Sequence, residues 1–241
     1  MAGTLFYCPN ILESPVLPEE ESYHCVKVLR TQEGEIINVT DGKGSFYHCE
    51  LVQAYPKQCI VAIRQQSKAV LNRSFSLHIA FAPTKQMDRN EWFLEKGTEI
   101  GIDRFTPLLC RYSERKEIKV ERLRKIVVSA MKQSMQAYLP EVETMVSFEA
   151  LVKRPFQGRK FIAHCHDLPK KELVQTYRKG ENALILIGPE GDFSEREVER
   201  AIELGFEPVS IGETRLRSET AALVSMHTIH VINNIYSFKE Q

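Results

Sequence analysis

The sequence has no excess of either charge, because 32 Lys and Arg residues balance 32 Asp and Glu residues. A protein that binds nucleic acid through its overall charge would be strongly basic. Any contact with a polyanion must therefore come from a local group of cationic side chains. The six cysteines form no C-x-x-C pair, and most lie in apolar, strand-like runs. This pattern predicts buried thiols, with neither a disulfide framework nor a zinc site.

Long apolar runs and an amino-terminal signal sequence are also missing. A bilayer-spanning helix needs about 20 consecutive apolar residues, and no run approaches that length. We therefore expect a cytoplasmic protein without a membrane segment. Hydrophobic residues make up 43% of the 241 positions. That content is enough for a real core, in one large domain or two modest ones.

The first 72 residues have the pattern of a small β-barrel. Runs rich in β-branched and aromatic residues predict strands at Leu5–Cys8, Glu35–Thr40, Phe46–Val52 and Cys59–Ile63. Asp41–Gly44 predicts a hairpin turn between the middle two strands. One helix is expected, at Ser22–Leu29. Lys27 and Arg30 lie about one turn apart there, so they are candidates for phosphate contacts, or for a solvated helix face.

From Phe75 onward, strand patterns alternate with helical patterns. The expected strands are Leu77–Ala82, Phe105–Cys110, Phe161–Cys165, Ala183–Ile187 and Pro208–Ile211. The expected helices between them are Met87–Ile100, Glu121–Ala137, Lys170–Lys179 and Glu195–Leu204. This alternation predicts an α/β domain, with a mostly parallel sheet and helices on both faces.

The last helix, predicted at Ser218–Tyr236, is apolar around almost its whole circumference. Such a helix must be buried on all sides. A terminal helix rarely achieves this within one subunit, so we expect a homodimer that forms through it. A central helix in the core of a single subunit is the alternative.

A strand, a tight turn and a helix follow one another in the second half of the chain. The run Ala183–Ile187 is typical of a buried parallel strand, and Gly188–Gly191 forms the turn after it. Ser194 and Glu197 have the spacing of a capping box. Ligands of open α/β sheets bind at the carboxyl ends of the strands. The turn is therefore a candidate ligand loop, although an ordinary connection would use similar residues.

Two further loops follow predicted strands in the same way. Ile211-Gly212 leads through Leu216 and Arg217 into the last helix, so its glycine should lie at the same sheet edge as Gly188. Arg217 could reach an anionic group near a helix N-terminus. The most basic short run contains Arg111, Arg115 and Lys116. These three are candidates for RNA contacts, or for a solvated loop.

Metal and dinucleotide sites are poorly supported. Alternation along a strand would place His164 and His166 on one face, where a metal could bind. No further His or Cys pair stands at ligand spacing, so we predict no metal. The turn Gly188–Gly191 does not match G-x-G-x-x-G and does not follow the first strand of its domain, which argues against a dinucleotide.

Several of these motifs occur together in one known family. Ile187–Gly191 with Phe193-Ser194, Ile211-Gly212 and Leu216–Ala221 closely resemble the ribosomal RNA small subunit methyltransferase E family. The resemblance covers nearly the whole chain. It includes Leu5-Phe6-Tyr7, His24 with Val28-Leu29-Arg30, Asp41-Gly42, Glu95–Gly101, Thr106-Pro107, Gln133-Ser134 and Pro140-Glu141.

The resemblance implies a PUA-like, RNA-binding β-barrel at 1–72 and a SPOUT domain with a carboxyl-terminal trefoil knot at 73–241. It implies a homodimer that uses S-adenosyl-L-methionine to methylate N3 of one uridine in small-subunit (16S) ribosomal RNA, either free or in the assembled small subunit. By resemblance, the cofactor residues are His164, Ile187, Gly188, Pro189, Glu190, Gly191, Ile211, Gly212, Leu216 and Arg217.

This chemistry needs more than positioning, because N3 of uridine carries a proton at neutral pH. A base, or a group that stabilises the uridine anion, is required. Arg217 is the candidate stabiliser, and Glu190 and Glu219 are the candidate bases. Each acid could instead cap a helix or bind hydroxyl groups of the cofactor.

The chain departs from the family pattern at several positions. Asp192 replaces a common glycine, which the loop should tolerate if the residue keeps a negative φ. Lys132, Gln136 and the pair Thr214-Arg215 also differ. These changes leave the cofactor loops credible, and they leave open how the Glu121–Ala137 helix contacts RNA.

Two other functions fit parts of the pattern. One is a knotted methyltransferase that acts on transfer RNA or at another position, and the motif Leu216–Ala221 with the PUA-like domain argues against it. The other is a non-catalytic RNA-binding module. The glycines at 188, 191 and 212 argue against that one.

Overall fold

The computed structural model describes residues 4–70 and 73–235, which form two compact units. The first unit contains the described residues of 1–72 together with 127–139. The second contains 73–126 and the described residues from 140 onward. Sequence patterns gave a single boundary near residue 72, whereas 127–139 also cluster with the first unit. No helix in the described part of the chain combines the length and the apolarity needed to cross a bilayer.

The first unit is built on a sheet with the strand order β1-β2-β3-β4. Its strands are β1 (Leu5–Tyr7), β2 (Ile36–Thr40), β3 (Ser45–Tyr55) and β4 (Gln58–Lys68). The predicted hairpin turn is confirmed, because Oδ1 of Asp41 accepts the backbone N–H groups of Lys43 at 2.7 Å and Ser45 at 3.1 Å. An Asp side chain that bonds the backbone two residues on fixes a tight turn locally.

The helical segment of this unit differs from the prediction. It begins earlier, as α1 (Glu19–Tyr23), and continues as the π-helix η1 (His24–Val28). Arg30 follows in a left-handed conformation with φ 59°. Lys27 and Arg30 are both exposed. Inserted π turns are rare and have no sequence periodicity that would reveal them.

The second unit contains a sheet in which every strand pair among the described residues is parallel. The order is β10-β12-β9-β11-β5-β6-β7, and β8 also pairs with β6. The central strands are β5 (Leu77–Phe81), β6 (Arg104–Leu109), β9 (Arg159–Ala163), β11 (Ala183–Ile187) and β12 (Glu207–Ser210). The short strands are β7 (Glu141–Val142), β8 (Val146–Ser147) and β10 (Lys171–Glu172).

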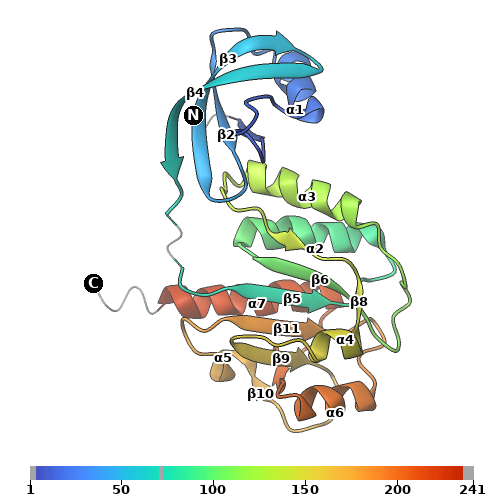
Figure 1. Cartoon of the computed structure of the whole chain (residues 1–241). Coiled ribbons are helices and arrows are strands. Elements are labelled where there is room, and N and C mark those ends of the chain that lie inside the picture. The colour runs from blue at the N-terminus through green and yellow to red at the C-terminus, as the bar shows by residue number, and fades with distance from the viewer. Residues whose placement is uncertain (1–3, 71–72, 236–241) are drawn as a thin grey trace. The chain divides into compact units, whose positions relative to one another are not determined.

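Strand β11 lies between β5 and β9, and all five of its residues are buried. This explains its continuous apolar run, because a strand covered on both faces has no solvent side. Helices cover the two faces of the sheet (Figure 1). One face packs on α4 (Phe148–Val152) and α6 (Glu195–Glu203). On the other face, α7 (Ser218–Ile235) contacts β5 and β11, and α2 (Met87–Ile100) packs beside α7.

Some predicted elements were wrong in detail. The predicted helix Lys170–Lys179 is instead the edge strand β10 followed by the short helix α5 (Leu173–Thr176). Parallel pairing of Lys171 with Val209 draws this segment onto the sheet. Helix α3 (Val120–Gln133) ends before the predicted Ala137. Cys165 is exposed, whereas the other five cysteines are buried as predicted.

Helix α7 is less completely covered than its composition suggests. Ala222, Met226 and Ile229 are fully buried, whereas Val231 is 36% exposed and Val224 is partly exposed. Tyr236, the predicted last residue of this helix, lies outside the described residues. One face of α7 therefore belongs to the core of its own unit, and the outer face carries Val224 and Val231 beside the exposed polar residues His227 and Asn234.

Candidate functional site

A pocket of about 660 Å³ opens at the carboxyl-terminal edge of the parallel sheet. Three loops form its walls: the segment after β9, the turn after β11 and the loop after β12. This is the edge at which open α/β sheets bind ligands. Nine of the predicted site residues line it: His164, Ile187, Gly188, Pro189, Glu190, Ile211, Gly212, Leu216 and Arg217. Glu219 lines it as well.

The turn after β11 is shaped by Phe193, which is fully buried. A Cβ atom at Gly188 would lie 3.1 Å from both the ring and the backbone nitrogen of Phe193. The glycine therefore packs tightly against a core side chain, and it also lines the pocket. Gly191 faces Tyr112 in a similar way, with 3.2 Å between such a Cβ and the Cβ of Tyr112.

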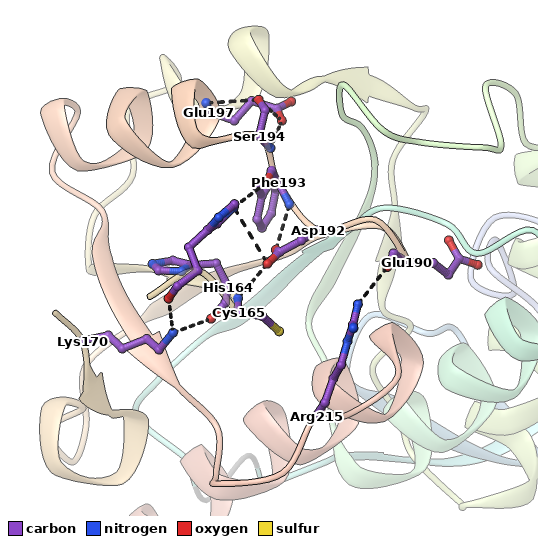
Figure 2. A network of polar contacts seen from close by, with 10 residues as sticks. His164, Cys165, Lys170, Glu190, Asp192, Phe193, Ser194, Glu197 and Arg215 are labelled. Atoms are coloured by element: carbon purple, nitrogen blue, oxygen red, sulfur yellow. Dashed lines mark hydrogen bonds and ion pairs between the residues drawn. The ribbon is translucent and has the colours of Figure 1, made fainter. Parts of the chain in front are cut away.

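Gly212 is a glycine for a different reason. Its φ is 138°, in a region that L side chains rarely adopt, and a Cβ there would meet no atom within 4 Å. The third loop therefore depends on glycine for its backbone path. Arg215 joins this loop to the turn after β11, because its Nη2 donates to the Glu190 carbonyl oxygen at 3.5 Å (Figure 2).

The condition set for Asp192, a negative φ, is not met, since its φ is 66°. Aspartate is one of the few residues that adopt this conformation readily. Its carboxylate accepts two backbone N–H groups, from Phe193 at 2.8 Å and from Cys165 at 2.7 Å (Figure 2). These bonds explain how a charged residue occupies a position where glycine is common in the family.

The predicted capping box at the start of α6 is confirmed. Ser194 Oγ accepts the Glu197 N–H at 3.4 Å, and Glu197 Oε2 accepts the Ser194 N–H at 2.8 Å. The second carboxylate oxygen of Glu197 accepts the Arg111 N–H at 2.9 Å. The cap thus also holds the basic loop that follows β6.

His164 is the most unusual side chain of the pocket. It is only 6% exposed, and neither of its ring nitrogens has a hydrogen-bond partner among the described residues. Burial lowers the pKa of His164, and Lys170 lowers it further, against a smaller opposing effect of Asp192. The ring is therefore neutral at pH 7, with one donor and one acceptor in need of partners.

The candidate catalytic groups differ in how far they are already engaged. Glu190 Oε1 accepts the Lys85 N–H at 3.0 Å, so this acid already holds a neighbouring loop. Glu219 is 6% exposed, and its Oε2 has no partner within the described part of the chain. Its Oε1 lies 3.8 Å from Nε of Arg89, which also lines the pocket. Arg217 is exposed.

The candidate RNA contacts lie outside this pocket. Arg111 and Lys116 are exposed, whereas Arg115 donates to the carbonyl oxygens of Thr84 and Lys85. Arg115 and Lys116 line a second pocket together with Lys85, Glu114 and Glu117. Lys27 and Arg30 belong to the first unit. There Lys132, one of the departures from the family pattern, pairs with Glu21 at 2.5 Å.

Sequence reasoning missed several pocket residues, among them Arg89, Lys170 and Asp192. Arg89 comes from α2, far from the strand-end loops in the sequence, and no local motif marks it. Asp192 was noticed only as a departure from the family pattern. Among the described residues, no group of three His, Cys, Asp or Glu side chains could hold a metal ion.

Comparisons with known proteins agree with this geometry. A family model described as an RNA methyltransferase domain matches residues 72–230, and one described as an RNA methyltransferase PUA domain matches residues 17–64. The fold class predicted from the sequence, a PUA-like domain before a mostly parallel α/β domain, is thereby confirmed. The trefoil knot stays a prediction.

Individual relatives cover nearly the whole chain. The ribosomal RNA small subunit methyltransferase E of Bacillus subtilis is 30% identical, with 91% of each chain covered. A probable rRNA-methyltransferase from Porphyromonas gingivalis is 42% identical with a TM-score of 0.92, over 97% of this chain and 99% of that one. The ribosomal RNA small subunit methyltransferase E of Neisseria gonorrhoeae was solved bound to S-adenosyl methionine. It is 26% identical with a TM-score of 0.83, over 95% of this chain and 98% of that one. The chain therefore belongs to the ribosomal RNA small subunit methyltransferase E family.

Proposed function

We propose that this protein uses S-adenosyl-L-methionine to methylate N3 of one uridine in small-subunit ribosomal RNA. The observation that carries the proposal is the pocket at the carboxyl ends of β9, β11 and β12. It combines glycine-bearing loops with buried polar groups that have no hydrogen-bond partner among the described residues. The names of the relatives support the RNA substrate, and the Neisseria structure supports the cofactor.

The residues present fit this cofactor. Pockets for small molecules typically measure about 300–1,000 Å³, and this one lies within that range. The neutral ring of His164 offers a donor and an acceptor for the polar groups of a nucleoside. The turn after β11 and the loop of Gly212 supply backbone groups around it. The bound cofactor would supply a methyl group on a sulfonium, which is a strong electrophile.

The protein's own task is to hold the uridine and manage its N3 proton. Glu219 is better placed than Glu190 to accept this proton, because its buried Oε2 has no partner among the described residues. Arg217 is exposed at the pocket and could stabilise negative charge that develops on a uracil oxygen. Arg89 adds a second cation beside Glu219.

The proposal extends to partners and assembly. The match to a PUA domain of RNA methyltransferases supports RNA binding by the first unit, where Lys27 and Arg30 are exposed. Arg111 and Lys116 are the candidate RNA contacts of the second unit. The partly exposed apolar residues Val224 and Val231 on the outer side of α7 support a homodimer through this helix. A cytoplasmic location follows from a ribosomal substrate.

Titration with S-adenosyl-L-methionine separates an enzyme from a module that only binds RNA. We expect saturable binding at one site per chain in isothermal calorimetry. Replacing His164 by Phe, which fills a similar space without polar groups, should weaken binding about tenfold or more through the lost hydrogen bonds. A folded wild-type protein that shows no binding heat would argue for the RNA-binding module.

A further inference from the structure

The segment after β9 is fastened to the turn after β11 by side chains rather than by a strand pair (Figure 2). Asp192 accepts the Cys165 N–H at 2.7 Å with one carboxylate oxygen and the Phe193 N–H at 2.8 Å with the other. His166 Nε2 lies 2.7 Å from the Phe193 carbonyl oxygen, to which it must donate. The bonds from Cys165 to Asp192 and from His166 to Phe193 therefore join the same two pieces of chain.

The fastened segment is held in shape by Lys170. Its Nζ donates to the carbonyl oxygens of His164 at 3.2 Å and His166 at 2.6 Å. The ammonium thus closes the loop that begins at His164 onto itself. His164, whose ring nitrogens find no hydrogen-bond partner in the described part of the chain, immediately precedes Cys165, whose N–H group Asp192 binds.

We propose that Asp192 is a positioning residue that sets the cofactor wall of the pocket, with His166 as its partner. The inference rests on the proposed use of S-adenosyl-L-methionine. Asp192 stands at φ 66°, where glycine would be free of strain but could make neither side-chain bond. The two bonds of the Asp192 carboxylate instead fix the position of the His164 segment relative to the turn that contains Pro189 and Glu190. A wall fixed in advance lowers the ordering cost of ligand binding.

The test compares Asp192→Gly, Asp192→Asn and the control Asp167→Gly. Asp167 lies in the same segment and is exposed. Asp192→Gly removes both bonds without backbone strain, so the dissociation constant of S-adenosyl-L-methionine should rise about ten- to a hundredfold. Asparagine also adopts a positive φ readily, and it keeps a single acceptor oxygen. The dissociation constant of Asp192→Asn should therefore lie between those of Asp192→Gly and wild type. Asp167→Gly should bind like wild type.

A purely stabilising role would give a different pattern. It would lower the unfolding temperature of the free protein and leave cofactor affinity intact. A positioning role should leave single-turnover methyl transfer at saturating cofactor within about threefold of wild type. The double variant Asp192→Gly/His166→Ala should lose less binding free energy for S-adenosyl-L-methionine than the two single variants lose together, because both residues fasten the same segment.

A second measurement needs no cofactor. Amide hydrogen exchange at Cys165 should become faster in Asp192→Gly, since this N–H loses its acceptor. Unchanged exchange at Cys165, or wild-type affinity in folded Asp192→Gly, would overturn the inference. Absence of binding in the wild-type protein, with exchange at Cys165 accelerated in the variant, would instead count against the proposed function.

Discussion

Replacing Arg217 by Ala should slow methyl transfer about 10²- to 10³-fold, the usual cost of losing one preorganised stabiliser of a developing anion. Arg217 lines the pocket and is exposed directly before α7. Within the described part of the chain Arg217 forms no ion pair, so its loss should leave the unfolding temperature nearly unchanged. The measurement is single-turnover transfer to small ribosomal subunits at saturating cofactor, alongside thermal unfolding.

Two further variants sharpen this result. Arg217→Lys keeps the charge and loses the planar fork, so it should recover only part of the rate. Arg196→Ala removes an exposed arginine from the first turn of α6, outside the pocket, and should transfer methyl groups like wild type. A near-normal rate in Arg217→Ala, or a rate loss that accompanies unfolding, would show that Arg217 does not serve the chemistry.

Replacing Val231 by Asp should convert the proposed homodimer into monomers. Val231 is 36% exposed on α7, so in a single subunit the new carboxylate can remain in water. In a dimer formed through this face, the charge would be buried without a partner, at a cost of about 3–5 kcal/mol. Val224→Asp tests a second, more enclosed position on the same helix. Sedimentation equilibrium gives the mass in solution, and circular dichroism gives the folded state.

Helix α6 provides a matched control for this experiment. Ile202 is a 43% exposed apolar residue on that helix, so Ile202→Asp makes the same kind of change away from α7. We expect Ile202→Asp to keep the assembly state of the wild type. A stable dimer in both α7 variants, or monomers in the wild type, would rule out assembly through α7.

The fold was predictable where residues repeat with a clear period. The buried run of β11, the capping box of Ser194 and Glu197 and the Asp41 turn each follow from local chemistry and are confirmed. The segment at 170–179 was predicted wrongly, because pairing of Lys171 with Val209 overrides its helical pattern. Elements of two residues, such as β7 and β10, are too short to show a period.

The pocket could be predicted only in part. The sequence shows which loops follow strands, but it does not show what the side chains of these loops contact. The two loop motifs after β11 and β12 gave most of its lining, including Gly188, Gly212 and Arg217. Gly188 also packs tightly against the buried ring of Phe193, a contact that the local sequence does not show. Arg89 reaches the pocket from a helix more than a hundred positions before Glu219, so only tertiary structure reveals the pair. Asp192 shows that a residue other than glycine can hold a positive φ in this turn, where its carboxylate accepts two backbone N–H groups.

The most direct test of the proposed activity is to map the methylated base. Small ribosomal subunits from a strain that lacks this gene would be incubated with the protein and S-adenosyl-L-methionine, then digested and analysed by mass spectrometry. Our account predicts one newly methylated uridine in the small-subunit RNA. Reverse transcriptase should stop at that base, because a methyl group on N3 blocks its pairing edge. Methylation of transfer RNA instead, methylation at another atom of the base, or no transfer by a protein that binds the cofactor would contradict it.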